Sequence, residues 1–299
     1  MVKLCQIIKL NWQLKLKNIF RILKLYFEYA IYVIAQNLFK CLSFNTTSFI
    51  GGFLLRYLGQ FSKYKNIISK NVSLLSSENF KITNDNLEQT GRVFFEFFNL
   101  NKFNWENIKI QNEQYLNLIR NHNGSKIFIS AHIGNWEITR NFLLKEGFTL
   151  HSVYRQANNQ MIDKYIQKKR EKKNAYFYKK GSDSAKNMIK ALKNGGDLAL
   201  LVDQRDSSGP LINFFNKKAF ASDGFANLAL KYHTMICPVY SIRNKDGSFQ
   251  FIYERPLEFN DYKNLNSKDL VQKVYFEYFE KWITKNPEQW LWAHERWKV

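Results

Sequence analysis

A histidine and a glutamate lie five residues apart, directly after a short apolar segment. Residues 126–130 read KIFIS and residues 131–137 read AHIGNWE, so His132 follows the apolar segment and Glu137 opens a helix-like one. An imidazole held at one nitrogen by a carboxylate keeps its other nitrogen free to accept a proton. The pair could therefore act as a general base and its orienting acid.

The elements around this pair must fold in a particular way to bring the two side chains together. KIFIS predicts a buried strand, and residues 136–147 predict a helix that ends at Gly147. On one continuous helix, residues i and i+5 point about 140° apart. We therefore expect a tight turn at Gly134, which tolerates unusual dihedral angles, to fold His132 back against Glu137. The carboxyl end of a strand is also where open α/β sheets bind ligands.

A purely structural explanation of the same residues stays open at this point. Gly134 or Asn135 could cap the helix, with Glu137 completing a capping box and His132 simply ending a strand. An isolated His-x4-Glu pair is more often of this kind. Further motifs are needed to decide between the two interpretations.

Composition indicates a folded protein without a disulfide framework or a metal centre. The 299 residues are 45% hydrophobic and 16% aromatic, with only 4 prolines and 13 glycines, which excludes a disordered chain. Cys5, Cys41 and Cys237 lie far apart and form no C-x-x-C, and the five histidines form neither H-x3-H nor H-E-x-x-H. We expect no metal and no cofactor. P-loop, G-x-G-x-x-G and G-x-S-x-G motifs are also missing from the sequence.

The net charge of +20 is concentrated in two segments. Residues 1–70 hold eleven Lys and Arg against Glu28 alone, and residues 155–193 hold twelve against three acidic residues. Such surfaces favour an anionic partner, which could be nucleic acid, acidic lipid or an acidic protein.

The amino-terminal part is aromatic, apolar and basic. Its longest uncharged run, residues 41–55, is shorter than the roughly 20 residues that a spanning helix needs. Lysines beside Trp12, Phe20 and Phe27 suit an anionic lipid interface. We expect residues 1–65 to form a membrane-associated helical region and residues 66–299 the catalytic domain. A buried helix pair of a soluble domain is one alternative, and a hairpin or re-entrant element is another, so the sequence leaves open whether the region spans the membrane or lies on it.

Beyond about residue 65, short apolar runs alternate with helix-like stretches. The runs are residues 126–130, 148–154, 198–202, 236–242 and 249–253, and the helix-like stretches are residues 136–145, 160–173, 184–193, 223–232 and 268–285. This alternation predicts an α/β fold with a mixed, mostly parallel sheet flanked by helices.

Several motifs resemble those of the late acyltransferases of lipid A biosynthesis, within the wider His-x4-Asp/Glu glycerolipid acyltransferase group. They are AHIGNWE (131–137), VYRQANN (153–159), ALKNGGDLALLVDQRDSSG (191–209), INFFNKKAFASDGFANLAL (212–230) and PEQWLWAHERWK (287–298), which follow one another in the family's order. The resemblance covers residues 120–298. The chain departs from the family pattern in FFN, where F-F-G is usual, and in Arg205, where an acid is commoner.

The resemblance implies transfer of a fatty acyl group from acyl carrier protein to a hydroxyl of a lipid A precursor. A hydroxyl is a poor nucleophile at neutral pH, so a base must remove its proton as it attacks the thioester. His132 would be that base and Glu137 would orient it, an effect worth roughly 10²–10⁴ in rate. The carrier resides in the cytoplasm, which places the protein at the cytoplasmic face of the inner membrane. The implied partners are the carrier, the lipid precursor and an anionic membrane surface.

Asn135, Arg155, Asp203 and Arg296 are further candidates for substrate binding. Arg155 follows an apolar run and could bind an acceptor phosphate or the carrier's phosphopantetheine, although a solvated strand-end arginine is equally common. Asp203, at the end of LALLVDQ, could be a second polar anchor at the same sheet edge, or a turn residue.

Two basic or aromatic segments also have structural explanations, and for KKREKK (168–173) the structural one is the commoner. KKREKK (168–173) could receive the carrier protein or simply form a solvated helix face. The tryptophans of the carboxyl-terminal segment could lie at a membrane interface or in the core.

Rival functions remain for the chain as a whole. It could acylate another glycolipid or glycerolipid, or be a non-catalytic membrane protein. A nucleic-acid-binding protein would also be basic and aromatic, but no recognition module is apparent and we expect no nucleic acid as partner. The acyl chain length, the acceptor hydroxyl and the oligomeric state cannot be derived from these residues.

Overall fold

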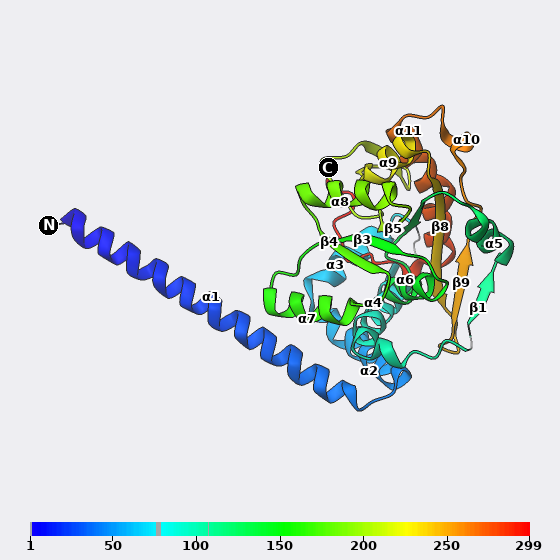
Figure 1. The fold of residues 1–299 in the computed structure, drawn as a ribbon. Helices are drawn as coiled ribbons and strands as arrows, with labels where there is room; N and C mark the ends of the chain where they lie inside the picture. The colour runs from blue at the N-terminus through cyan, green and yellow to red at the C-terminus, as the bar shows by residue number, and fades with distance from the viewer. Residues whose placement is uncertain (1, 76–78, 107) are drawn as a thin grey trace.

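The computed structural model of the protein describes residues 2–75, 79–106 and 108–299. Within these residues, the body is built on a seven-stranded sheet of order β1-β9-β8-β2-β5-β3-β4 (Figure 1). Its strands are β1 Lys109–Gln111, β2 Lys126–Ser130, β3 Leu150–Tyr154, β4 Ala175–Lys179, β5 Asp197–Leu201, β8 Met235–Arg243 and β9 Phe249–Tyr253. Neighbours are parallel except β8 and β9. The mixed, mostly parallel sheet predicted from the sequence is confirmed.

Helices flank the sheet and extend beyond it. They are α1 Val2–Lys40, α2 Phe44–Leu58, α3 Lys63–Val72, α4 Asn79–Glu96, α5 Glu113–Asn121, α6 Trp136–Lys145, α7 Gln160–Arg170, α8 Ser182–Lys193, α9 Gly224–Tyr232, α10 Phe259–Tyr262, α11 Ser267–Val274 and α12 Glu280–Lys285. Short 3-10 segments are η1 Gly59–Phe61, η2 Phe97–Lys102 and η4 Pro287–Gln289, and η3 Tyr275–Phe279 is a π-helical turn. Strands β6 Leu211–Phe214 and β7 Lys217–Phe220 form a separate hairpin.

Both faces of the sheet are covered, which explains why β2 is apolar at consecutive positions. Ile127 and Ile129 belong to a core shared with α8, α9, α11 and α12, whereas Phe128 belongs to a second core shared with α5 and α6. Successive side chains of a strand point to opposite faces. A strand buried on both faces is therefore apolar at consecutive positions, as residues 127–129 are here.

The predicted elements agree with the structure best around β2. β2 and α6 begin and end where the sequence pattern placed them. The predicted helix 268–285 is present but interrupted by the π-helical turn η3. β4, with the sequence AYFYK, was not predicted, and its residues are partly buried or exposed. The short β1 and the β6–β7 hairpin were also missed.

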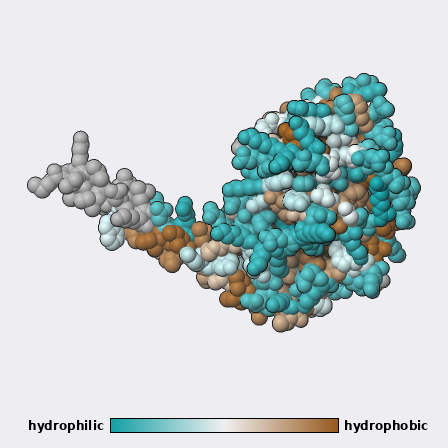
Figure 2. Space-filling view, viewed as in Figure 1, coloured by the Kyte–Doolittle hydropathy of each residue, from teal (hydrophilic) through white to brown (hydrophobic). Residues whose placement is uncertain are grey.

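The amino-terminal helices differ from the rest of the body in their exposure. α1 projects away from the body (Figure 1), and Figure 2 shows apolar residues gathered on the part of α1 nearer the body and along the lower edge near α2. Apolar side chains exposed by 50% or more of their area on these helices are Trp12, Ile19, Phe20, Leu23, Tyr26, Phe27, Ile31, Ile34, Leu38, Phe49, Phe53, Tyr57 and Leu58. The helical character predicted for this region is present, and α1 is not one of a buried helix pair.

The second helix is anchored to the body by a close crossing with α4. A methyl group added at Gly91 would lie 2.2 Å from the carbonyl oxygen of Gly51, so both glycines are needed for this approach. Among the described residues, no helix combines the length and the apolar character needed to cross a bilayer.

Candidate active site

The turn between β2 and α6 has the form that Gly134 permits. Its φ is +57°, and a methyl group there would lie 1.8 Å from the carbonyl oxygen of Ser241. The amide of Gly134 also donates a hydrogen bond to the carbonyl of Gln289 at 2.9 Å. The tight turn predicted from the sequence is therefore confirmed, and it is held against β8 and the carboxyl-terminal segment.

Asn135 caps helix α6 and lies inside the protein. Its side-chain oxygen accepts hydrogen bonds from the amides of Glu137 and Ile138 at 3.0 and 3.1 Å. Its side-chain amide donates to Glu96 at 2.6 Å, and Glu96 is ion-paired with Arg243. Asn135 is 1% exposed and does not line the cavity described below. It holds the turn, in contrast to the substrate-binding role expected from the sequence.

His132 is held by Asp203, which comes from the neighbouring strand. His132 Nδ1 lies 2.7 Å from Asp203 Oδ1, and the backbone amide of His132 donates to Asp203 Oδ2 at 2.9 Å. Ser130 and Leu201 are partners in the register of parallel strands β2 and β5. The residues two positions further along each strand, His132 and Asp203, consequently meet beyond the sheet edge.

The carboxylate of Asp203 is buried yet well compensated. Only 2% of its area is exposed, and the indole nitrogen of Trp290 donates to its Oδ2 at 2.7 Å. Burial alone raises the pKa of this carboxyl, but the charge of His132 and the hydrogen bonds from His132 and Trp290 outweigh burial and lower the pKa. An ionised Asp203 accepts the Nδ1 proton of His132, which leaves Nε2 as the nitrogen able to take a proton.

Glu137 does not contact His132. Its carboxylate instead forms an ion pair and hydrogen bonds with Arg170, at the end of α7. The contact expected between Glu137 and His132 is thus corrected: Asp203, 71 residues away in sequence, occupies the position that the spacing suggested for Glu137. The reason is that Glu137 lies in the first turn of α6, which leads away from the histidine turn, whereas the strand register aligns Asp203 with His132.

The carboxyl-terminal segment locks the histidine turn in place. The amide of Leu291 donates to the carbonyl of His132 at 2.8 Å, and Ile133 forms an isolated bridge with Trp290. Trp290 and Trp292 are 2% and 0% exposed. These tryptophans belong to the core, and the membrane-interface interpretation of them is not supported.

Arg296 also serves the core, in contrast to the substrate-binding role expected for it. It is 1% exposed and donates to the carbonyl of Phe220 at 2.6 Å and to the hydroxyl of Tyr275 at 2.9 Å. Its guanidinium lies over the rings of Phe214 and Tyr275. A planar, weakly hydrated cation is suited to such a packed aromatic site.

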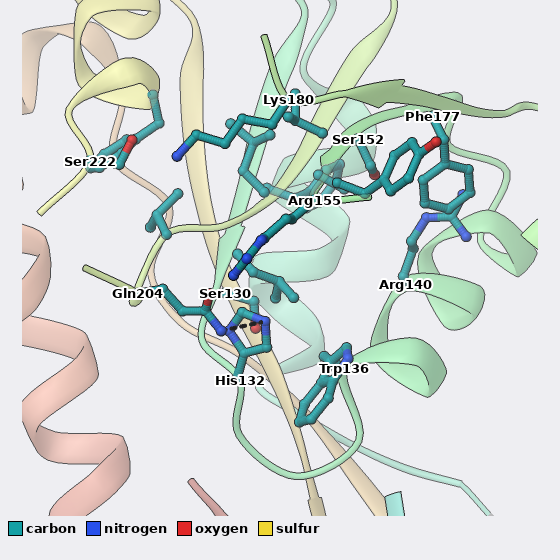
Figure 3. A pocket seen from close by; sticks show the side chains of 18 of the residues that line it. Ser130, His132, Trp136, Arg140, Ser152, Arg155, Phe177, Lys180, Gln204 and Ser222 are labelled. Carbon is teal, nitrogen blue, oxygen red and sulfur yellow. Dashed lines mark hydrogen bonds between the residues drawn. The ribbon is translucent and has the colours of Figure 1, made fainter. Parts of the chain in front are cut away.

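A cavity of about 1050 Å³ opens at His132. Along α6 it is lined by Trp136, Arg140 and Leu143, which are spaced by one helical turn and share a face. The ring of Trp136 lies edge-on to the imidazole, with centroids 5.0 Å apart. Figure 3 shows Gln204 beside His132, with its side-chain nitrogen 3.4 Å from Nε2.

The cavity wall is strongly basic. Its charged side chains are Arg140, Arg155, Arg170, Lys179, Lys180 and Arg205 against Glu137 and Asp206. Figure 3 shows Arg155 pointing from β3 toward His132, as expected of a residue at the same sheet edge. His294 also lines the cavity, and burial lowers its pKa. Within the described ranges, no group of His, Cys, Asp and Glu has an arrangement that could hold a metal ion.

Two wall residues, Arg140 and Arg170, were missed from the sequence as cavity residues. Arg170 lies within KKREKK, where a solvated face or a carrier surface was expected. Only part of that run is solvated: Arg170 pairs with Glu137, and Lys169 donates to the carbonyl of Phe98 at 2.6 Å. The signal that could have found Arg140 is its position one turn after Trp136 on α6.

Comparison with known proteins comes from a family model and from solved structures. The model described as bacterial lipid A biosynthesis acyltransferase matches residues 15–299. A structural match is the 1-acyl-sn-glycerophosphate (LPA) acyltransferase PlsC from Thermotoga maritima, with a TM-score of 0.39, 13% identity, and coverage of 83% of this chain and 96% of that one. A likeness this weak carries no argument about the present chain. No curated protein matches the sequence.

Proposed function

We propose that this chain, which belongs to the bacterial lipid A biosynthesis acyltransferase family, transfers a fatty acyl group from acyl carrier protein to a hydroxyl of a lipid A precursor, with His132 as the general base. The observation that carries this proposal is that His132, paired with the buried Asp203, lines a basic cavity. The reaction uses two substrates and requires no cofactor.

The chemistry follows from the protonation of the pair. Nε2 of His132 takes the proton of the acceptor hydroxyl as its oxygen attacks the thioester carbonyl. The C–S bond then breaks, and the imidazolium returns the proton to the leaving sulfur, which gives the free carrier thiol and an ester. Asp203 keeps the imidazole in the required tautomer and stabilises its cationic form. Such assistance is worth roughly 10²–10⁴ in rate.

Arg155 has a supporting role in this proposal. It lies on the cavity wall and points toward His132 (Figure 3). A guanidinium in that place would bind an anionic oxygen, either on a substrate phosphate or on the carbonyl that becomes negatively charged during attack. Changing Arg155 to Ala should therefore lower kcat.

The amino-terminal region is proposed to associate with the cytoplasmic face of the inner membrane. Its support is the exposed apolar surface of α1 and α2 together with the basic excess of residues 1–70. Apolar side chains interspersed with Lys and Arg bind anionic bilayers through both burial and charge. Removing residues 1–40 should reduce sedimentation with phosphatidylglycerol vesicles, while full-length protein that stays wholly in the supernatant at physiological salt would contradict this.

Mass spectrometry of lipid A tests the function most simply. Cells lacking the gene should accumulate a species lighter by one acyl chain, and wild-type protein, but not His132→Ala, should restore the chain. An unchanged lipid A together with a changed glycolipid or glycerolipid would assign the same chemistry to another acceptor. No change in any acylated lipid would contradict the proposal.

A further inference from the structure

The inner part of the cavity contains polar atoms that no described residue satisfies. Arg140 Nε and Nη2 and Ser152 Oγ are buried and have no hydrogen-bond partner among the described residues. Ser152 is only 5% exposed, and both side chains line the cavity. A buried donor without a partner is costly, especially on a charged group. An occupant that accepts hydrogen bonds would remove this cost.

The three polar atoms belong to one place in the fold. Ser152 of β3 and Phe177 of β4 are direct partners in the strand register, so their side chains lie side by side on one face of the sheet. The guanidinium of Arg140 lies 3.9 Å from the centre of the Phe177 ring. Figure 3 shows Arg140, Phe177 and Ser152 together, away from His132.

The charge of this place is positive. Arg170 lies 5.4 Å from the centre of the same Phe177 ring, and the carboxylate of Glu137 is already paired with Arg170. Among the described residues, Arg140 thus has no carboxylate of its own. Burial lowers the pKa of Arg140 to about 10, an effect opposed by Glu137 and reinforced by Arg170. At neutral pH the Arg140 side chain is still charged. An aliphatic chain of a substrate could not compensate this charge.

We propose that Arg140 and Ser152 form an anion subsite that binds a phosphate group of a substrate whose reacting group lies at His132. A guanidinium edge suits two phosphate oxygens, and the hydroxyl of Ser152 can donate to a third. Arg140 follows Trp136 by four residues, which is roughly 6 Å along the helix axis. The subsite is therefore set back from the histidine along α6 and is distinct from Arg155, which points toward His132 (Figure 3).

The phosphate could come from the acceptor lipid or from the phosphopantetheine of the donor. Naming these sources rests on the proposed function, whereas the subsite itself does not.

The test is the thermal stability of full-length protein in mild detergent, titrated with inorganic phosphate, glucosamine 1-phosphate or 4′-phosphopantetheine at constant ionic strength. Lys268→Met, which removes an exposed cation from α11, is the control for lost charge.

In wild type and Lys268→Met, phosphate should raise the melting temperature with the same half-saturating concentration. In Arg140→Met that concentration should rise about tenfold or more, as expected for loss of charged hydrogen bonds. Ser152→Ala should show a smaller rise. Without phosphate, Arg140→Met should melt at the same or a higher temperature, because a buried charge without a partner has been removed. A merely structural arginine would instead lower it.

The probe whose binding depends on Arg140 identifies the source of the phosphate. Equal half-saturation in wild type and Arg140→Met for all three probes would overturn the subsite, as would the lack of any saturable shift in wild type. Arg140-dependent binding in a protein that transfers no acyl group would leave the subsite standing and refute the proposed function.

Discussion

Asp203 and Glu137 are two carboxylates close to the same histidine turn, but they have different partners. Asp203 is 2% exposed and bonds to His132 and to Trp290, whereas Glu137 is 8% exposed, lines the cavity and pairs with Arg170. The first holds the imidazole of His132 in place, and the second balances the charge of a basic wall. The comparison teaches that strand register selects the partner of His132, while closeness in sequence does not.

Replacing Asp203 by Asn should have the largest effect. An amide has nearly the same size but cannot accept the Nδ1 proton as an anion, and it allows the tautomer with Nε2 protonated. We expect kcat to fall by roughly 10²–10⁴, as for loss of general-base assistance. Because the two residues act as a unit, His132→Ala combined with Asp203→Asn should lose little more than either alone. A folded Asp203→Asn protein with normal turnover would break the comparison.

Replacing Glu137 by Gln should affect stability more than chemistry. The change leaves Arg170 without its carboxylate in a partly buried place, which should cost about 1.5–3 kcal/mol of unfolding free energy. We expect kcat to fall by less than about tenfold, well below the loss of a general base. Chemical denaturation and steady-state kinetics measure the two effects separately.

A double-mutant cycle sharpens this second prediction. Arg170→Met removes the unpaired cation. The double variant Glu137→Gln, Arg170→Met should therefore lose less unfolding free energy than the two single variants lose in total. The comparison would fail if Glu137→Gln abolished turnover at unchanged stability, because Glu137 would then act directly in the chemistry.

The smallest expected effect concerns Lys169, which lies next to Arg170 in the last turn of α7. Burial lowers the pKa of Lys169 from 10.5 to about 8. Between about pH 8 and pH 10 the unfolded chain binds a proton that the folded chain has released, so this group makes the unfolding free energy rise with pH. Lys169→Met should lack that contribution. Equal pH dependence of the two proteins in denaturation experiments would contradict the burial of this lysine.

The sequence predicted the elements around the site better than the contacts within it. KIFIS followed by a glycine-containing turn determines β2, α6 and the place of His132, because each depends on local pattern. Asp203 was predicted at the same sheet edge but not as the partner of His132, because that contact depends on the register between β2 and β5. Local spacing contains no information about register.

Polar and charged residues in largely apolar surroundings were the hardest to assign from the sequence. Arg296 and Asn135 have polar side chains that resemble site residues in sequence, but both are buried with satisfied or aromatic surroundings. Arg140, conversely, lies within an apolar helix face and has no motif around it. Only the folded structure, which places Arg140 over the ring of Phe177 in β4 and on the cavity wall, shows where its guanidinium lies.

The most direct test of the central claim is the hydrogen bond at His132 Nδ1 itself. Among five histidines, NMR of protein labelled with ¹⁵N-histidine can identify the signals of His132 by their loss in His132→Gln. A carboxylate-bonded Nδ1 proton should give a strongly downfield, slowly exchanging resonance that persists in Glu137→Gln and disappears in Asp203→Asn. Loss of the resonance in Glu137→Gln, with its retention in Asp203→Asn, would contradict the assignment of Asp203 as the residue that orients the base.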